Sequence, residues 1–179
     1  MLEVLVTILI LAIGLLGLAG LQTRVQLAET EAYQRAQAIV LLEDIKARIN
    51  ANRKNAMDYV TASPLGTGNA VADCSGLAGA DFDTCQWGNA LLGASETTSA
   101  GSTGAMIGAR GCIANTVPTM PREFLISVVW QGLNATVAPS STTCGQGQFG
   151  NDAMRRAIVA KVVIGCLQND PSTGLCVTP

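Results

Sequence analysis

The chain has 179 residues, a net charge of −2 and a pI near 5.0. This length suffices for one sizeable core, or for one core plus an extended element. Because the net charge is slightly negative, the composition lacks the excess of basic residues that is typical of nucleic-acid-binding proteins, so we expect no nucleic-acid partner. The sequence contains no histidine, which removes the commonest general base and metal ligand and every Ser-His or Cys-His triad. We therefore expect a protein that is not an enzyme and has no cofactor.

An uncharged, mostly apolar run lies between Glu3 and Arg24. As a helix, these roughly 20 residues would span about 30 Å, the thickness of the hydrocarbon core of a bilayer. The first proline of the chain is Pro64, and the composition up to about Asn52 favours one helix about 75 Å long. Residues 1–24 are therefore predicted to form a transmembrane or filament-core half of this helix.

From Arg24 onward the predicted helix becomes amphipathic. Apolar residues recur at helical spacing and form one stripe suited to packing on a domain, while most charged residues lie on other faces. We expect residues 25–55 to form this amphipathic half and residues 56–179 to form a globular α+β domain. The stripe consists of Ala38, Leu41, Leu42, Ile45 and Ile49.

Glu3 is the most informative single residue, because an ordinary membrane span avoids a carboxylate at its edge. Deep in a bilayer a carboxylate costs on the order of 2.5–3.5 kcal/mol, although less near the interface. Two interpretations stay open: Glu3 lies in the head-group layer, or it meets a cationic partner once the helix leaves the lipid. In a dry core a carboxylate must be paired, and an ammonium group is a good partner.

Gly14, Gly17 and Gly20 fall three residues apart, close to one face of the predicted helix. Small residues let neighbouring apolar helices approach each other, which is the simplest interpretation. The alternative is a flexible or partly melted turn that helps the helix leave the bilayer. Because no proline follows this region, we favour a continuous helix.

The domain sequence contains three stretches that indicate loops. Residues 61–80 and 139–153 are rich in Gly, Ser and other turn-forming residues, and residues 94–104 indicate a surface connection. Within the second stretch, Gly145-Gln146-Gly147 lacks the lysine and the following helix of a phosphate-binding loop. These stretches are therefore predicted to connect elements and to carry no chemistry.

A short helix is predicted after the first of these loops. Asp83 is a plausible N-cap for a helix that passes through Trp87 and Leu91 and ends at Gly93. The neighbouring carboxylates Asp81 and Asp83 suggest calcium only weakly, because a calcium loop needs several alternating oxygen ligands. No metal site is predicted.

Three strands are predicted, at residues 106–113, 123–131 and 157–166. The first pattern is weak, whereas the other two show alternation of apolar side chains. These periods predict an antiparallel meander of three or four strands, packed on the amphipathic half of the long helix. The residues expected on the buried faces are Phe124, Ile126, Val128 and Trp130, and Ile158, Ala160, Val162 and Ile164.

The cysteines indicate disulfides in an oxidising compartment, because their number is even and no two stand in a metal-binding spacing. Six free buried thiols are the alternative. Cys74–Cys85 is the expected pair, since its loop is short and local, and the remaining pairing stays open. The six are Cys74, Cys85, Cys112, Cys144, Cys166 and Cys176.

The run Met1-Leu2-Glu3-Val4-Leu5-Val6, followed by the apolar stretch from Leu9 to Leu21, resembles the N-terminus of type IV pilins and pseudopilins. Mature members of that family begin with an N-methylated residue and carry a glutamate at the fifth position. The resemblance implies that Glu3 is this glutamate, which pairs with the N-terminal amine of a neighbouring subunit. The numbered chain would then begin two residues inside the mature N-terminus, and the processing glycine would lie outside it.

The resemblance also implies the type IV pilin fold, in which a long N-terminal helix packs on a small antiparallel sheet. Contacts between subunits would come from the apolar half of the helix, where the glycines allow close packing. The residues expected there are Leu2, Glu3, Leu5, Leu9, Gly14, Gly17 and Gly20.

A narrower resemblance is to PilV-type minor pilins. It rests on the segment from Leu9 to Gln22, on Arg110-Gly111-Cys112-Ile113, on Val129-Trp130-Gln131-Gly132, and on Arg155-Arg156 before a final apolar strand. It implies a subunit that helps prime type IV pilus assembly and enters the pilus near the tip. The implied partners are other minor pilins, the major pilin and an adhesin-like tip protein. The implied location is the bacterial inner membrane with the domain in the periplasm, and later the pilus at the cell surface.

Two alternatives belong to the same superfamily. A type II secretion pseudopilin would share the fold and the N-terminal signature. A DNA-binding pilin is less favoured, because the segment 55–179 has eight acidic and five basic residues, a net charge of −3. A local patch of Arg155, Arg156 and Lys161 keeps that alternative open.

Overall fold

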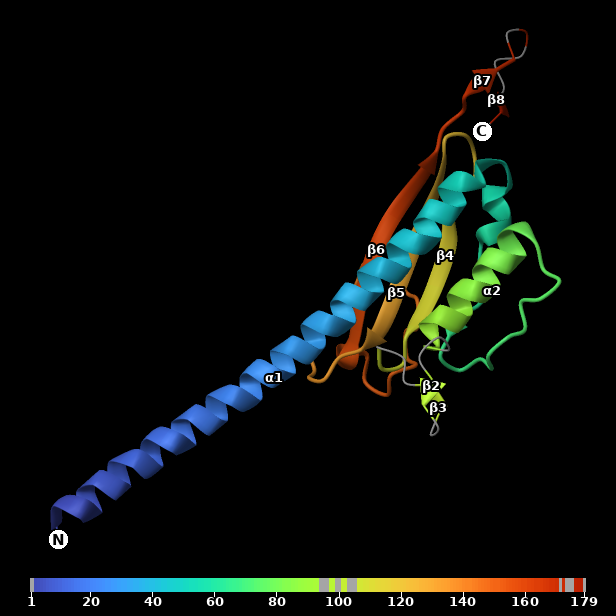
Figure 1. Ribbon diagram of the computed structural model, residues 1–179. Helices are drawn as coiled ribbons and strands as arrows, with labels where there is room; N and C mark the ends of the chain where they lie inside the picture. Colours follow the sequence, from blue (N-terminus) through green and yellow to red (C-terminus); the bar gives the residue numbers. More distant parts are fainter. Residues whose placement is uncertain are drawn as a thin grey trace. The chain divides into compact units, whose positions relative to one another are not determined.

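The computed structural model of the chain describes residues 2–93, 97–98, 101–102, 106–170, 172 and 176–178 (Figure 1). The chain divides into two compact units, Met1–Tyr33 and Gln34–Pro179. In chain order the elements are the helix α1 (Leu2–Ala51), the 3-10 helix η1 (Arg53–Tyr59), β1 (Leu65–Gly66), α2 (Gly79–Leu91), β2 (Thr97–Thr98), β3 (Gly101–Ser102), β4 (Arg110–Val117), β5 (Arg122–Gln131), the 3-10 helix η2 (Asp152–Met154), β6 (Arg155–Ile164), β7 (Gln168–Asn169) and β8 (Cys176–Thr178).

The helix α1 is a single element of 50 residues, which confirms the prediction of one long N-terminal helix. Leu, Ala, Glu and Gln favour the helical backbone, and the absence of proline before Pro64 leaves its hydrogen-bond ladder intact. The helix ends where Asn52 adopts a non-helical backbone with φ −114° and ψ 48°, and η1 follows it.

The main sheet has four strands in the order β1-β4-β5-β6, and every neighbouring pair is antiparallel. The pairing of β5 with β6 runs without a register shift, and it places Ile126 opposite Ala160. Ile126 also lies opposite Ile113 of β4. The predicted α+β class and the antiparallel meander are thus confirmed.

The second half of α1, from Gln34 onward, packs on one face of this sheet together with α2, as Figure 1 shows. The apolar stripe predicted on α1 supplies this contact. Leu41 is partly buried, and the other four residues of the stripe are buried. Trp87 of α2 is fully buried and donates its indole N–H to the carbonyl oxygen of Leu41 at 2.9 Å. The buried residues that β5 and β6 contribute to this core are Phe124, Ile126, Val128, Trp130, Val162 and Ile164.

Gly111 of β4 allows α2 to approach the sheet closely. A Cβ atom at this position would lie 2.2 Å from Cη2 of Trp87 and 2.7 Å from Cδ1 of Leu91. Both neighbours belong to the packed core, so neither can move aside without opening a void. The close approach of backbone and ring explains why glycine stands within this strand.

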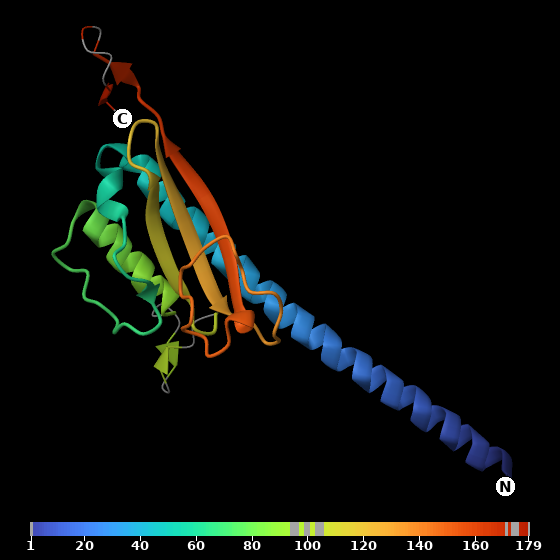
Figure 2. The same cartoon turned by 180° about the vertical axis from the view of Figure 1, so that it is seen from behind.

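Neither α1 nor α2 covers the opposite face of the main sheet (Figure 2). The segment between β5 and β6 crosses part of this face and forms a small second core there. That core contains Val129 and Phe149, with Cys144 beside them. Helices therefore cover one face of the sheet, whereas the segment between β5 and β6 covers part of the other.

The described cysteines form three disulfides, Cys74–Cys85, Cys112–Cys144 and Cys166–Cys176. The first is the one pair predicted from the sequence, and it joins the 61–80 loop to α2. The second joins β4 to the loop between β5 and β6. The third closes the C-terminal hairpin that contains β7 and β8.

Several predicted boundaries are wrong. The helix α2 begins at Gly79, after the extended residue Ala78, and not at Asp83. The side chain of Asp83 does not cap the helix because it binds Arg48 and Tyr59. The strand expected at 106–113 is β4, displaced toward the C-terminus because Gly108 makes a turn with φ +64°.

The other differences from the predicted elements are smaller and concern two loops and the last strand. The 61–80 loop contains the two-residue strand β1, which pairs with β4. Most of the connection predicted at 94–104 lies outside the described residues. Its described residues are β2 and β3, which form a separate antiparallel pair. The strand predicted at 157–166 begins two residues earlier and ends at Ile164.

Candidate functional site

The apolar first part of α1 carries all the residues predicted to contact other subunits. Leu2, Leu5 and Leu9 have side chains that are 78%, 67% and 61% exposed. A Cβ atom added at Gly14, Gly17 or Gly20 would meet no atom within 4 Å. The structure thus leaves this surface unoccupied within the chain, although large apolar side chains normally lie inside proteins.

The predicted contact residues do not share one face of α1. At about 100° per residue, Leu2, Leu5 and Leu9 fall on one side of the helix, while Glu3 and Gly14 fall on another. The segment between Glu3 and Arg24 is apolar in every direction. A helix of this kind needs a nonpolar environment on all sides, which lipid or a bundle of similar helices provides.

Glu3 is exposed and lies in the first turn of α1. The next charged side chain on the helix, Arg24, lies about 30 Å farther along its axis. By length and composition α1 is able to cross a membrane, and it is the one such helix among the described residues. The first part of α1 therefore fits a membrane anchor with a single carboxylate at its head.

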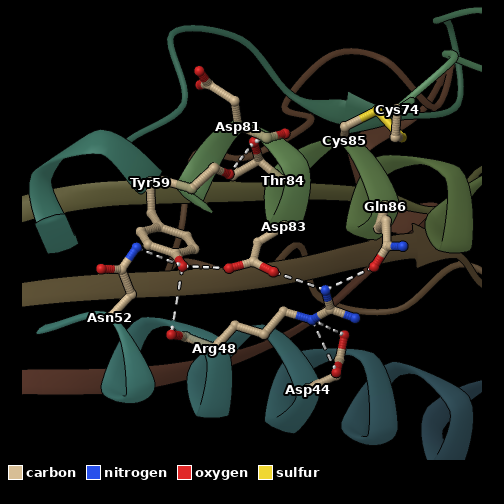
Figure 3. A network of polar contacts seen from close by, with 11 residues as sticks. Asp44, Arg48, Asn52, Tyr59, Cys74, Asp81, Asp83, Thr84, Cys85 and Gln86 are labelled. Atoms are coloured by element: carbon tan, nitrogen blue, oxygen red, sulfur yellow. Dashed lines mark hydrogen bonds and ion pairs between the residues drawn. A yellow bond between two sulfur atoms is a disulfide. The ribbon is translucent and has the colours of Figure 1, made fainter. Parts of the chain in front are cut away.

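The end of α1 carries a polar network that the sequence analysis does not predict (Figure 3). Arg48 donates to Asp44 within α1, at 3.0 Å, and to Asp83 of α2, at 2.9 Å. Its Nη1 group also donates to Gln86 at 2.9 Å. Tyr59 of η1 donates its hydroxyl to the other carboxylate oxygen of Asp83. The network ties α1, η1 and α2 together at one point.

The network changes the proton affinities of two of its members. Burial, together with the hydrogen bond to Asp83, raises the pKa of Tyr59 to about 12. Burial lowers the pKa of Arg48, but its bonds to Asp44 and Asp83 outweigh this effect and raise the pKa above its ordinary value. Tyr59 and Arg48 therefore keep their protons and remain hydrogen-bond donors over the physiological pH range.

The two carboxylates considered for calcium do not form one site. Both oxygens of Asp83 already accept hydrogen bonds, from Arg48 and from Tyr59. Figure 3 shows the carboxylate of Asp81 turned away from that of Asp83. Within the part of the chain that the structure describes, no cluster of three or more His, Cys, Asp or Glu residues is able to hold a metal ion.

The basic patch considered for DNA is also engaged in contacts. Arg155 is 1% exposed and pairs with Asp152 at 2.7 Å. Lys161 pairs with Glu123 at 2.8 Å. Arg156 donates to the carbonyl oxygens of Ala153 and Asn134. These cations are therefore partly or fully compensated within the domain.

Comparison with protein-family models, with curated proteins and with solved structures gives no match for this chain. The function is therefore inferred from the residues and from the arrangement described above.

Proposed function

We propose that the chain is a minor pilin of the PilV type. In this role it is a non-enzymatic structural subunit that helps prime type IV pilus assembly and is incorporated into the pilus near the tip. Its partners would be other minor pilins, the major pilin and an adhesin-like tip protein. Before assembly it would reside in the bacterial inner membrane with its domain in the periplasm, and afterwards in the pilus at the cell surface.

One observation carries the proposal: a single helix has an exposed apolar first part and a second part buried in a domain core. Residues such as Leu9 and Ile13 are more than 60% exposed, whereas Ile45 and Ile49 are fully buried. An anchor that later enters a filament needs this division. Lipid covers the apolar part first, and equivalent helices of other subunits cover it after assembly.

Glu3 gives the proposal its specific chemistry. In a filament core the carboxylate leaves the head-group layer and enters a low-dielectric surrounding, where it requires a cationic partner. The N-terminal amine of an adjacent subunit would meet this need. The pair would then set the axial register between neighbours, because any other register buries an unpaired charge.

A type II secretion pseudopilin is the second candidate, since the same helix and the same sheet suit both roles. Genetic neighbourhood separates the two. Genes for other minor pilins and a large adhesin beside this one support the pilus role. A general-secretion operon with its secretin supports the pseudopilin role.

The proposal is tested by replacing Glu3 with leucine or alanine in the full-length chain. We expect normal amounts of the variants in the inner membrane but a fall of about tenfold in pili sheared from the cells. The variants lack the carboxylate that would pair with the amine of an adjacent subunit, so that amine would be buried in the filament without a partner. Glu29→Ala is the matched control, because Glu29 is an exposed carboxylate on the same helix beyond the apolar run. Normal recovery of the Glu3 variants in sheared pili would contradict the proposed role of Glu3.

A further inference from the structure

A groove of about 540 Å³ lies on the sheet face opposite α1, between residues 61–64 and residues 140–148. Its volume falls within the range of roughly 300–1,000 Å³ that is usual for small-molecule sites. Figure 2 shows the segment between β5 and β6 crossing this face of the sheet. The groove is thus bounded by two loops and floored by strands.

The floor of the groove is small and mostly apolar. It consists of Cys112 and Ala114 on β4 and of Leu125 and Ser127 on β5. Ser127 is 2% exposed, and its hydroxyl donates to Oγ1 of Thr142 at 2.8 Å. The short side chains of Cys112, Ala114 and Ser127 allow a ring-shaped ligand to lie close to the strands.

One wall of the groove is held rigidly. The disulfide Cys112–Cys144 joins the 140–148 loop to β4. The buried guanidinium of Arg155 donates to the carbonyl oxygens of Thr142, Cys144 and Pro139, at 2.8, 3.2 and 3.1 Å. A wall fixed in this way loses little conformational entropy when a ligand binds.

A further contact supports the same loop. The guanidinium of Arg110 lies over the ring of Phe149, 4.9 Å from its centroid. Gly145, with φ +63°, brings the backbone against that ring. Connecting loops are usually more mobile than the strands they join, whereas the disulfide, the buried guanidinium and this ring contact hold the 140–148 loop against the sheet.

The rim of the groove carries hydroxyl and amide side chains that are exposed and have no hydrogen-bond partner among the described residues. By contrast, Thr61, Ser127 and Thr142 are engaged within the protein. These groups line the groove and are available to a ligand. They belong to Ser63, Ser140, Ser141, Thr143, Gln146 and Gln148.

The chemistry of the groove selects among ligand classes. The described lining residues include no charged side chain, so phosphates, nucleic acids and acidic peptides would find no counter-charge. An extended peptide that adds a strand to β4 is disfavoured, because Thr61 already occupies that edge. Its backbone N–H donates to the carbonyl oxygen of Ile113 at 3.0 Å, and its hydroxyl accepts from the N–H of Ile113 at 3.0 Å.

We propose that this groove binds a neutral carbohydrate. A pyranose ring has an apolar C–H face, which suits the floor of Ala114 and Leu125, and a rim of hydroxyls, which suits side chains able to donate and accept. This activity is additional to pilus assembly and does not depend on it. Recognition would rest on the amides of Gln146 and Gln148, the longest polar side chains at the rim.

The test uses the full-length chain in lauryldimethylamine oxide, because a glucoside or maltoside detergent would compete for the groove. The protein is applied to an array of neutral, sialylated and sulfated oligosaccharides. We expect binding to neutral oligosaccharides and a loss of about tenfold or more in the double variant Gln146→Ala/Gln148→Ala, since each side chain supplies hydrogen bonds to the ligand. Gln168→Ala is the matched control, because Gln168 is exposed and lies outside the groove; its binding should stay within about twofold of the unmodified chain.

Three outcomes would overturn the proposal: no binding to any neutral oligosaccharide, binding restricted to sialylated or sulfated ones, or equal binding by the double variant. Both exchanged glutamines are exposed, and neither side chain forms a hydrogen bond within the described part of the chain, so the variant should keep the unfolding temperature of the unmodified protein. A preserved unfolding temperature assigns any loss of binding to the groove itself.

Discussion

Ile13 and Ile45 are both isoleucines of the helix α1, yet Ile13 is 64% exposed and Ile45 is fully buried. The difference follows from what surrounds each residue in the sequence. Ile45 belongs to a stripe whose other faces are polar, and the domain covers that stripe. Ile13 belongs to a stretch that is apolar on every face, which one domain face is unable to cover. The comparison teaches that the pattern of hydrophobicity, more than its amount, determines whether a helix packs within its own chain.

The largest expected effect separates these two isoleucines directly. Ile45→Ala should lower the free energy of unfolding by about 2–5 kcal/mol, because it leaves a cavity in a packed core. Ile13→Ala should change it by less than about 0.5 kcal/mol, because Ile13 contributes nothing to that core. Urea titration of the full-length chain in detergent measures both values. Equal destabilisation by the two variants would show that the comparison is wrong.

Removal of the Cys74–Cys85 disulfide tests how much the domain depends on covalent links that the anchor lacks. The double variant Cys74→Ser/Cys85→Ser should lose about 2–4 kcal/mol of unfolding free energy, since the unfolded chain gains freedom. Membrane insertion should be unchanged. Mass spectrometry after alkylation without reduction provides the check on the unmodified protein, and labelling of both cysteines there would refute the pairing.

A smaller effect is expected from Tyr59→Phe, which removes the hydroxyl that binds Asp83. Near pH 7 the variant should lose on the order of 1–2 kcal/mol of unfolding free energy. The pKa of Tyr59 is about 12 in the folded chain, against about 10 in an unfolded one. The native state therefore keeps a proton that the unfolded state releases, and the unmodified protein should lose stability as pH rises from about 10 to about 12.

The measurement is the difference in unfolding free energy between the unmodified protein and Tyr59→Phe at several pH values. This difference in unfolding free energy should have its full value below about pH 10 and should shrink toward pH 12. Only the unmodified protein contains Tyr59, so only its stability falls as this hydroxyl ionises in the unfolded state. A difference that stays constant over the whole range would mean that Tyr59 does not hold its proton more tightly in the folded state.

Much of the fold was predictable because its signals are local and periodic. The length of α1 follows from its composition and from the absence of proline before Pro64. The buried stripe of α1 and the inward faces of β5 and β6 follow from periods of about 3.6 and 2 residues. Cys74 and Cys85 were predictable as a pair because they are near each other in sequence.

The remaining features depend on partners that are distant in sequence. Asp83 has the composition of an N-cap, yet Arg48, 35 residues earlier, binds its carboxylate, and α2 starts upstream. Arg155 was assigned to a surface patch, but it is buried among carbonyl groups of a loop that precedes it. The groove beside that loop had no signal in the sequence, because serine, threonine and glutamine in a loop also occur without any function.

Deletion of residues 1–24 from the full-length gene, with export to an oxidising compartment, tests the division of α1 most directly. Every buried residue of the main core lies at or beyond Ala38, so the remaining chain should fold, unfold cooperatively with heat and stay out of the membrane fraction. It should also be absent from sheared pili. A truncated product that is insoluble or unfolded would contradict the account, because the apolar first part of α1 would then belong to the core of the domain.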